Sequence, residues 1–557
     1  MLSMLIRYPV WAMQNLFRRL RKPPEYVTFM LAGEYSEYPQ PPGNLVMRRL
    51  RPPKISLLEL GEQFRSVAGD PRVQGVVLHL RPLDMAPAAI ESLRDLIKEL
   101  RESGKRVVAW ATFYVPSNYL VACAADEILM QPSGDISALG MGRTYPYLAN
   151  ALKKVGIAGD FLPITPYKSA RDMFSRKNMS KEVRKMANWL MDSAYEERLH
   201  AISEGRGIDV EAARGLVDQT PMPDNKALEL NVVDALLGEE DLPKHLGSDA
   251  EPARLATWET ARKTLLLPRP VRVGKYVALI PIEGTIMDGK SGRPPVKPPI
   301  DLPILTEPRA GDLTVVQAAR QALRDKRAAG VVVYVNSRGG SATSSEAMRA
   351  ALEKIAETKP LVVSMGPVAA SGGYWVSTPG RQIFAQPSTI TGSIGVILGK
   401  IVAHDLLDRL FIGREKIRRG EHTDIYDAES RFTKVEREML WGSITRIYDL
   451  FLDRVVESRG MTREQVDELG GGRVWTGRQA YDNGLVDQIG GLGAAIAKAR
   501  ELAGLSPKAP ARLVTVGKGQ LVPAAHPAAM LEYAMEGARF LQGTRPLCIS
   551  PLALDKT

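Results

Sequence analysis

An internal repeat divides this chain of 557 residues into two related parts. The apolar run at residues 75–80 (GVVLHL) returns 255 positions later, at residues 330–335 (GVVVYV). The tripeptide Gln-Pro-Ser shows the same separation, at residues 131–133 and 386–388. The same separation between two pairs of matching segments indicates a tandem duplication of one folding unit. The chain is therefore expected to contain two copies of one domain.

The fold class follows from the pattern inside each copy. Apolar strands alternate with helices whose apolar residues recur every three or four positions, which is typical of an α/β domain. A chain of this length is also too long for a single hydrophobic core. The expected segments are an N-terminal arm (1–25), a first domain (26–237), a linker (238–275), a second domain (276–505) and a C-terminal tail (506–557).

Composition excludes several classes of protein. The net charge of +11 comes from dispersed basic residues, and aromatic residues make up only 6%. A nucleic-acid-binding module would show a basic face with interleaved aromatics, so nucleic acid is not an expected partner. Two cysteines are too few for a disulfide framework, and the six histidines lack the spacing of metal ligands. No metal or cofactor is expected.

The N-terminal arm predicts contact with a membrane surface. Its apolar stretch is interrupted by Arg7 and Pro9 and is shorter than a membrane-spanning helix requires. Its charges follow the apolar residues, which is the reverse of a secretory signal. An interfacial helix fits better, with the residues around Trp11 and Phe17 in lipid and residues 18–22 at the headgroups. A docking arm packed on the protein itself is the alternative.

A serine and a pair of glycines follow two neighbouring strands of the second copy. Ser371 comes at an expected strand-to-helix turn, where serine often serves only as an N-cap. Small residues around it leave room for a substrate carbonyl, and the N–H of Gly372 would face developing negative charge. Gly339 and Gly340 follow the preceding strand and can expose N–H groups to an oxyanion, although they also fit an ordinary turn.

The two copies complement each other at these positions. A serine nucleophile needs a base, and no motif places a histidine to act as one. With the 255-residue offset, Lys168 of the first copy falls opposite Thr423, while Ser371 falls opposite Pro116. The glycine pair likewise falls opposite residues 84–85 (Asp-Met). One copy therefore supplies the base and the other the nucleophile, which predicts an active site at the seam between the two domains.

The chain resembles signal peptide peptidase A in its long, duplicated bacterial form, a family of serine–lysine proteases. The resemblance covers most of residues 26–500. It implies that Ser371 is the nucleophile, that Lys168 is the general base and that Ser393 orients the lysine. The motifs that carry it are YKSA (167–170), NSRGGS (336–341), ASGGYW (370–375), STITGSIG (388–395) and VWTG (474–477).

The resemblance also implies a fold and a set of partners. The family fold is a Clp/crotonase-like ββα spiral, here expected as two tandem domains with connecting helices. Family members form rings, which suggests a tetramer, and they cleave apolar peptides such as cleaved signal peptides. Two features depart from the family: Arg338 stands where proline is usual, and no spanning helix is present. Peripheral attachment in a bacterial cell envelope is expected, with a cytoplasmic location as the alternative.

Two other functions remain open from the sequence. The same spiral fold can bind acyl-CoA, with the glycine pair holding a thioester enolate. That chemistry does not require a serine paired with a lysine. A membrane-associated scaffold without catalysis is the second alternative, and the retention of both Ser371 and Lys168 argues against it.

Overall fold

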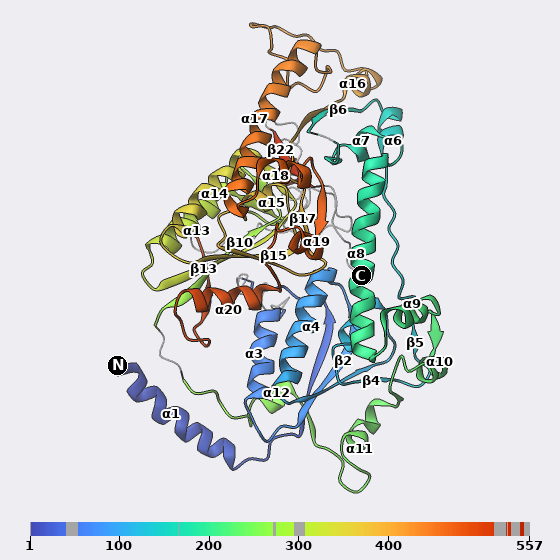
Figure 1. Cartoon of the computed structure of the whole chain (residues 1–557), viewed down its shortest axis with the longest axis vertical. Coiled ribbons are helices and arrows are strands. Elements are labelled where there is room, and N and C mark those ends of the chain that lie inside the picture. The colour runs from blue at the N-terminus through green and yellow to red at the C-terminus, as the bar shows by residue number, and fades with distance from the viewer. Residues whose placement is uncertain are drawn as a thin grey trace. The chain divides into compact units, whose positions relative to one another are not determined.

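The structure is a computed structural model of the whole chain (Figure 1). It describes residues 2–40, 54–164, 166–270, 274–294, 307–516, 531, 533–535 and 546–550. Most of the proline-rich loop at 289–308 and much of the tail after residue 506 lie outside the described residues. The α/β class predicted from the sequence is confirmed, because parallel sheets alternate with helices throughout.

The chain forms two compact units whose limits differ from a simple division into copies. The first unit contains Met1–Gly142 and Ala194–Gly274, and the second contains Arg143–Ser193 and Lys275–Leu554. The segment Arg143–Ser193 belongs by sequence to the first copy but by contacts to the second unit. The expected first domain, 26–237, is therefore divided between the two units.

The first unit is built on a parallel sheet with the strand order β8-β4-β3-β2-β1-β9. Its central strands are nearly continuous apolar runs, as expected for a sheet covered on both faces. Helices α3 (Leu57–Ala68) and α4 (Pro87–Glu102) lie side by side against one face (Figure 1). The strands are β1 (Tyr26–Gly33), β2 (Gly75–Leu83), β3 (Arg106–Ala111), β4 (Glu127–Met130), β8 (Ala235–Leu236) and β9 (Leu255–Thr257).

The main sheet of the second unit has the corresponding order, β20-β16-β15-β13-β10-β21, again all parallel. A buried tyrosine also recurs: Tyr119 Oη donates to Val232 O, and Tyr374 Oη donates to Leu485 O. The strands are β10 (Tyr276–Glu283), β13 (Ala328–Ser337), β15 (Leu361–Ala370), β16 (Gln382–Ala385), β20 (Gln488–Ile489) and β21 (Ala511–Leu513).

Two additions to this sheet shape the candidate site. The end of β15 also pairs with β17 (Ile390–Gly392), which pairs in turn with β19 (Val474–Thr476).

The helices of this unit include α13 (Asp312–Arg324), α14 (Ala342–Ala356), α17 (Lys434–Arg459) and α20 (Leu492–Leu502). The long helix α8 (Lys181–Arg206) begins in this unit and corresponds in sequence to α17.

A second sheet in this unit has the order β12-β11-β14-β22-β18-β6. Strand β6 (Ala158–Pro163), from the first copy, runs antiparallel to β18 (Ile397–Val402) along its whole length. This pairing is one reason why residues 143–193 belong to the second unit. The other strands are β11 (Thr285–Met287), β12 (Arg309–Gly311), β14 (Gly339–Ser341) and β22 (Leu547–Ile549).

The N-terminal helix α1 (Leu2–Arg19) belongs to the first unit. Among the helices of the described residues, none has the length and apolar character needed to cross a membrane.

Candidate active site

Ser371 lies where β15 ends and α15 (Gly372–Trp375) begins. Its φ of 57° and ψ of −116° are unusual for a residue with a Cβ, and such backbone strain concentrates at functional sites. Its N–H donates to Gly392 O at 2.7 Å, which ties the turn to the end of β17. The sharp turn holds the buried hydroxyl of Ser371 in one position at the end of the sheet.

The structure brings the amine of Lys168 to this hydroxyl. Lys168 Nζ lies 2.6 Å from Ser371 Oγ, 2.9 Å from Ser393 O and 3.1 Å from Ser393 Oγ. Ser393 has a φ of 52°, and its N–H donates to Arg473 O. The three polar residues expected from the sequence therefore meet around one amine.

Burial changes the acidity of this amine. Lys168 is 2% exposed, and the oxygens around its Nζ are uncharged. Burial disfavours the ammonium form and lowers the pKa of Lys168 from its ordinary 10.5 to about 7, against a smaller opposing effect of Cys548. A large fraction of the amine is therefore neutral near physiological pH and can accept a proton.

A glycine that the sequence did not single out allows Lys168 to approach. Gly472 has a φ of +84°, and a Cβ on it would lie 2.4 Å from Lys168 N and 2.6 Å from Lys168 Cα. The N–H of Tyr167 donates to Gly471 O at 3.0 Å, so the two backbones run in contact. The run of three glycines at 470–472 before β19 was the available signal.

An apolar cluster fixes the segment that carries the lysine. Trp189 stacks on Trp475 at 5.1 Å between ring centroids, and its Nε1 donates to Val474 O. Because these contacts lie inside the second unit, the expectation of a site at the seam between two domains is wrong. The buried members of the cluster are Tyr167, Met186, Leu190, Val368, Ala370, Ile390 and Val474.

The glycines predicted to bind the oxyanion lie beside Ser371. Gly339 has a φ of +98°, and a Cβ on it would lie 2.6 Å from Gly372 N. The glycine pair and the start of α15 are therefore adjacent, as expected. The Gly339 N–H donates to Ser337 Oγ at 3.1 Å, and Gly340 pairs with Cys548 of β22.

The first unit lacks a comparable arrangement at the corresponding turn. Pro116 begins α5 (Pro116–Ala122), and the hydroxyl of Ser117 accepts a hydrogen bond from the Leu83 N–H. Ser117 therefore has a local structural role. This agrees with the 255-residue offset between the copies, which placed Pro116 opposite Ser371.

Comparisons with known proteins found related peptidases. A family model described as "Peptidase family S49" matches residues 99–251 and 353–506. The chain is 30% identical to "Serine protease SPPA, chloroplastic" of Arabidopsis thaliana over 462 residues, which covers 81% of this chain and 66% of that protein.

Two bacterial relatives are similar to a comparable degree. "Protease 4" of Haemophilus influenzae is 31% identical over 479 residues, covering 81% of this chain and 74% of the relative. "Protease 4" of Salmonella typhi is 31% identical over 467 residues, covering 81% and 72%. A solved ClpP1 mutant from Listeria monocytogenes aligns at 14% identity with a TM-score of 0.25, over 39% of this chain and 94% of that chain, which is too low to assign a fold.

Proposed function

Since this chain belongs to peptidase family S49 and is a serine-type peptidase of the signal peptide peptidase type, we propose that Ser371 and Lys168 are its catalytic dyad. The observation that carries the proposal is the 2.6 Å contact between the buried Lys168 amine and Ser371 Oγ at a strained turn. Such a pairing of nucleophile and base is the general signature of an activated serine.

The dyad acts by acyl transfer. Neutral Lys168 accepts the proton of Ser371 Oγ as that oxygen attacks the scissile carbonyl carbon. The resulting ammonium then protonates the leaving amine, and a water molecule, deprotonated by the same lysine, hydrolyses the acyl-enzyme. Ser393 orients the amine through its hydroxyl and its carbonyl oxygen.

The oxyanion is held by backbone N–H groups. Because the Gly339 N–H already donates to Ser337 Oγ, we assign the donors to Gly372 and Gly340. Gly339 contributes by letting the two backbones come close. Donors preorganised in this way act where charge develops in the transition state, and removing one typically costs about 10²–10³-fold in kcat.

The substrates we propose are apolar peptides, including cleaved signal peptides. The apolar surroundings of Ser371 favour apolar peptides, and the name of one relative, "Putative signal peptide peptidase SppA" of Enterococcus faecium, favours signal peptides. We further propose that both units have the Clp/crotonase-like spiral fold and that the protein assembles into a ring of four. The matching strand orders of the two parallel sheets support the first point. Membership of a peptidase family argues against the acyl-CoA-binding and scaffold alternatives.

The pH dependence of hydrolysis tests the role of Lys168. The pKa of this amine is lowered to about 7 by burial, and only the neutral form is a base. We therefore expect kcat/KM for an apolar fluorogenic peptide to rise tenfold per pH unit below pH 7 and to level off above it. A profile that is flat between pH 5.5 and 8.5, with chemistry limiting the rate, would count against Lys168 as the base.

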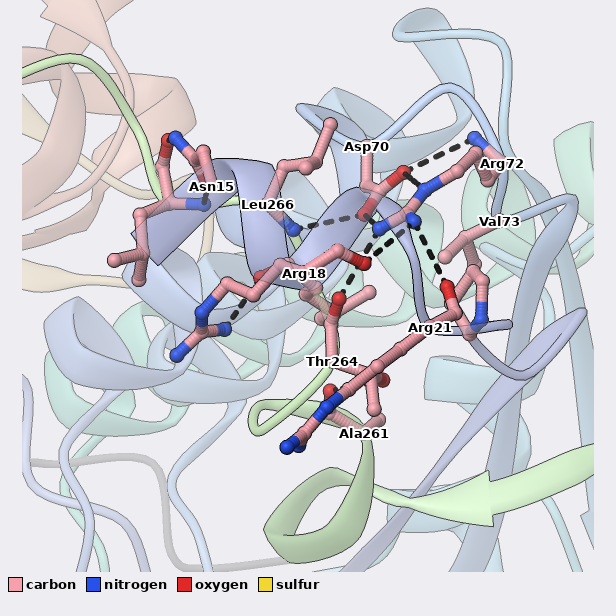
Figure 2. A network of polar contacts seen from close by, with 12 residues as sticks. Asn15, Arg18, Arg21, Asp70, Arg72, Val73, Ala261, Thr264 and Leu266 are labelled. Atoms are coloured by element: carbon pink, nitrogen blue, oxygen red, sulfur yellow. Dashed lines mark hydrogen bonds and ion pairs between the residues drawn. The ribbon is translucent and has the colours of Figure 1, made fainter. Parts of the chain in front are cut away.

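We also propose that α1 binds an anionic membrane surface. Figure 2 shows how the first unit holds this helix: Asp70 pairs with Arg72, and Arg72 donates to Arg18 O and Arg21 O. The side chain of Asn15 bonds both the N–H and the carbonyl oxygen of Leu267. A helix fixed along one side presents its other side outward. The large apolar residues of α1 exposed away from these contacts are Val10, Met13, Leu16 and Phe17.

A charge placed on this outward side is expected to weaken membrane binding. The Leu16 side chain is 60% exposed, so Leu16→Glu should not disturb folding, but it would place a carboxylate among acyl chains. We expect about a tenfold loss in cosedimentation with phosphatidylglycerol vesicles. Leu313→Glu is the matched control, because Leu313 of α13 is 61% exposed and lies in the other unit. Equal losses in both variants, or none in either, would contradict the assignment.

A further inference from the structure

A short loop before β19 holds both the proposed base and the residue that orients it. We call residues 470–473 the glycine loop. Its carbonyl oxygens accept the N–H groups of Tyr167 and Ser393, at 3.0 and 2.6 Å. Lys168 follows Tyr167 directly, and Ser393 contacts its amine. A displacement of the glycine loop would therefore move the base and its orienting group together.

The side chain of Arg473 ties the glycine loop to Tyr167. Its guanidinium carbon lies 4.5 Å from the centroid of the Tyr167 ring, and its Nη1 donates to Gly470 O at 3.1 Å. The indole of Trp189 contacts the same ring, at 5.6 Å between centroids. A cation is attracted by the face of an aromatic ring, more strongly where water is excluded, and Tyr167 is buried. The ring of the residue before the base is thus held by a cation and an indole.

Helix α17 fixes the backbone from which this cation extends. The N–H of Gly471 donates to Tyr448 Oη at 2.9 Å, and Tyr448 Oη donates in turn to Asp467 Oδ1 at 2.5 Å. The N–H of Arg473 donates to the carbonyl oxygen at the start of the glycine loop, at 3.1 Å. The Arg473 side chain therefore starts from a backbone with anchors of its own, and it can hold the Tyr167 ring in place.

Contacts that both copies retain serve the fold. The ion pair of Arg459 with Asp487 recurs in the first unit as Arg206 with Asp234, although the nucleophile has no counterpart there. The buried tyrosine that donates to a carbonyl oxygen recurs as well. Contacts needed only for the reaction should therefore be confined to the surroundings of Ser371.

The three groups that meet beside the base do not recur in this way. They are the Tyr167 ring, the Trp189 indole and the Arg473 cation. The 255-residue offset, the alignment of α8 with α17 and the pairing of β7 (Met222–Pro223) with β5 (Asp135–Ile136) identify their counterparts in the other copy. In the same order, these counterparts are His422, Gly442 and Thr220. The contact of cation and rings therefore belongs to the site and not to the repeated fold.

We propose that Arg473 is a positioning residue of the reaction, which holds Lys168 within reach of Ser371 through the ring of Tyr167. The proposal rests on the proposed dyad. Arg473 acts through Tyr167 because the hydrogen bonds of the Lys168 amine go to Ser371 and Ser393. Loss of the cation frees the ring, lets the segment that carries the base shift, and admits water to its amine. A displacement near 1 Å can cost about 10²-fold in rate.

Arg473→Met in the full-length protein tests the proposal, because it keeps a long side chain and removes the cation. We expect kcat for an apolar fluorogenic peptide to fall about tenfold to thirtyfold, with KM changed less than about threefold. The midpoint of kcat/KM against pH should move upward from about 7 by at least about half a unit, since a base that gains solvent is more easily protonated. A variant that only loses stability has a lower Tm and an unchanged midpoint.

Further variants keep the test decisive if Arg473→Met folds poorly. Arg473→Lys places a cation near the ring and should recover at least about threefold of the lost kcat. Tyr167→Leu removes the ring and should move the pH midpoint in the same direction as Arg473→Met. The double variant should be within about twofold of the worse single variant, because both changes remove one and the same contact.

Arg512→Met is the matched control. Arg512 is exposed and lies 5.0 Å from the ring centroid of Tyr276, in the second unit, so its replacement removes a similar contact between a cation and a ring. Because neither residue contacts a group of the candidate site, kcat should stay within about twofold of the wild type, and the pH midpoint should not move.

The outcomes separate this proposal from the proposed dyad. An upward shift of the midpoint in Arg473→Met and not in Arg512→Met would support the positioning role. An unchanged midpoint in Arg473→Met, in a protein that Lys168→Met inactivates, would overturn the positioning role and leave the dyad intact. Additive losses in the double variant would overturn it as well. Full activity in Lys168→Met would overturn the dyad itself, and the positioning role with it.

Discussion

Replacing Ser371 with alanine, or Lys168 with methionine, is expected to lower kcat/KM for an apolar peptide by at least about 10⁴-fold. Members of a nucleophile–base pair act as a unit, so either loss removes most of the catalysis, and the double variant should be little worse than either single one. Steady-state hydrolysis of a fluorogenic peptide measures this effect. A serine-directed phosphonate probe should label the wild-type protein and not the Ser371→Ala variant.

The matched control is a half-buried lysine in the same unit. Lys359 Nζ donates to Ala322 O at 2.6 Å and to Asp325 O at 2.8 Å, and burial lowers its pKa. Lys359→Met removes these contacts, neither of which involves a residue of the candidate site, so it should reduce stability and leave kcat/KM within about threefold. Retention of more than about 1% of the activity by Lys168→Met would contradict the proposed base.

Stability should separate Lys168, the proposed base, from Lys359. The pKa of Lys168 is about 7 in the folded state and near 10.5 when unfolded, so between these values the unfolded chain binds more protons. The stability of the wild type should therefore rise with pH across this window, by several kcal/mol at most, relative to Lys168→Met. At pH 7 the methionine variant should have an equal or higher Tm, because an apolar side chain suits this site better than a buried amine.

Gly472→Ala is expected to lower kcat/KM by about 10²-fold or more while leaving every polar group of the site in place. The new methyl group would lie 2.4 Å from Lys168 N, so the lysine backbone must move, and displacements near 1 Å can cost this much. The same peptide assay measures the loss, and the apparent kinetic pKa should move upward from about 7 as the displaced amine gains solvent.

The control for Gly472→Ala carries the same backbone strain without the clash. Gly460 has a φ of +65° and ends helix α17, and a Cβ there would meet nothing within 4 Å. Gly460→Ala should lower Tm with little effect on kcat/KM. If both variants lose activity equally, strain alone explains the loss and the contact with Lys168 does not.

Much of the candidate site could be predicted from local sequence signals. Ser371 and the pair Gly339–Gly340 follow apolar strands of the repeated pattern, and the offset between copies showed that Lys168 has no counterpart in the second copy. Such signals are short in range, since a strand followed by small residues and a helix is encoded within about fifteen positions.

Other features could not be predicted, because they depend on pairing between distant segments. Nothing within β6 indicates that its partner is β18, some 240 residues later, rather than a strand of its own copy. The same holds for β22, whose three residues carry no signal that they lie against β14. For this reason the site was expected at the seam between two domains, whereas its residues lie within one unit. For the same reason the sequence analysis did not identify Gly472 or Cys548 as neighbours of the site.

The sequence by itself determined the duplication and the α/β class. It also predicted Ser371 and Lys168, because the two copies differ at the positions where chemistry is expected, and the family resemblance added Ser393. Only the tertiary structure decided where the lysine lies, that burial lowers its pKa to about 7, and that β22 pairs with the glycine strand β14. The acidity of a buried amine depends on what surrounds it, and those surroundings come from β15, β17 and the 470–472 glycine run, which meet only in the folded chain.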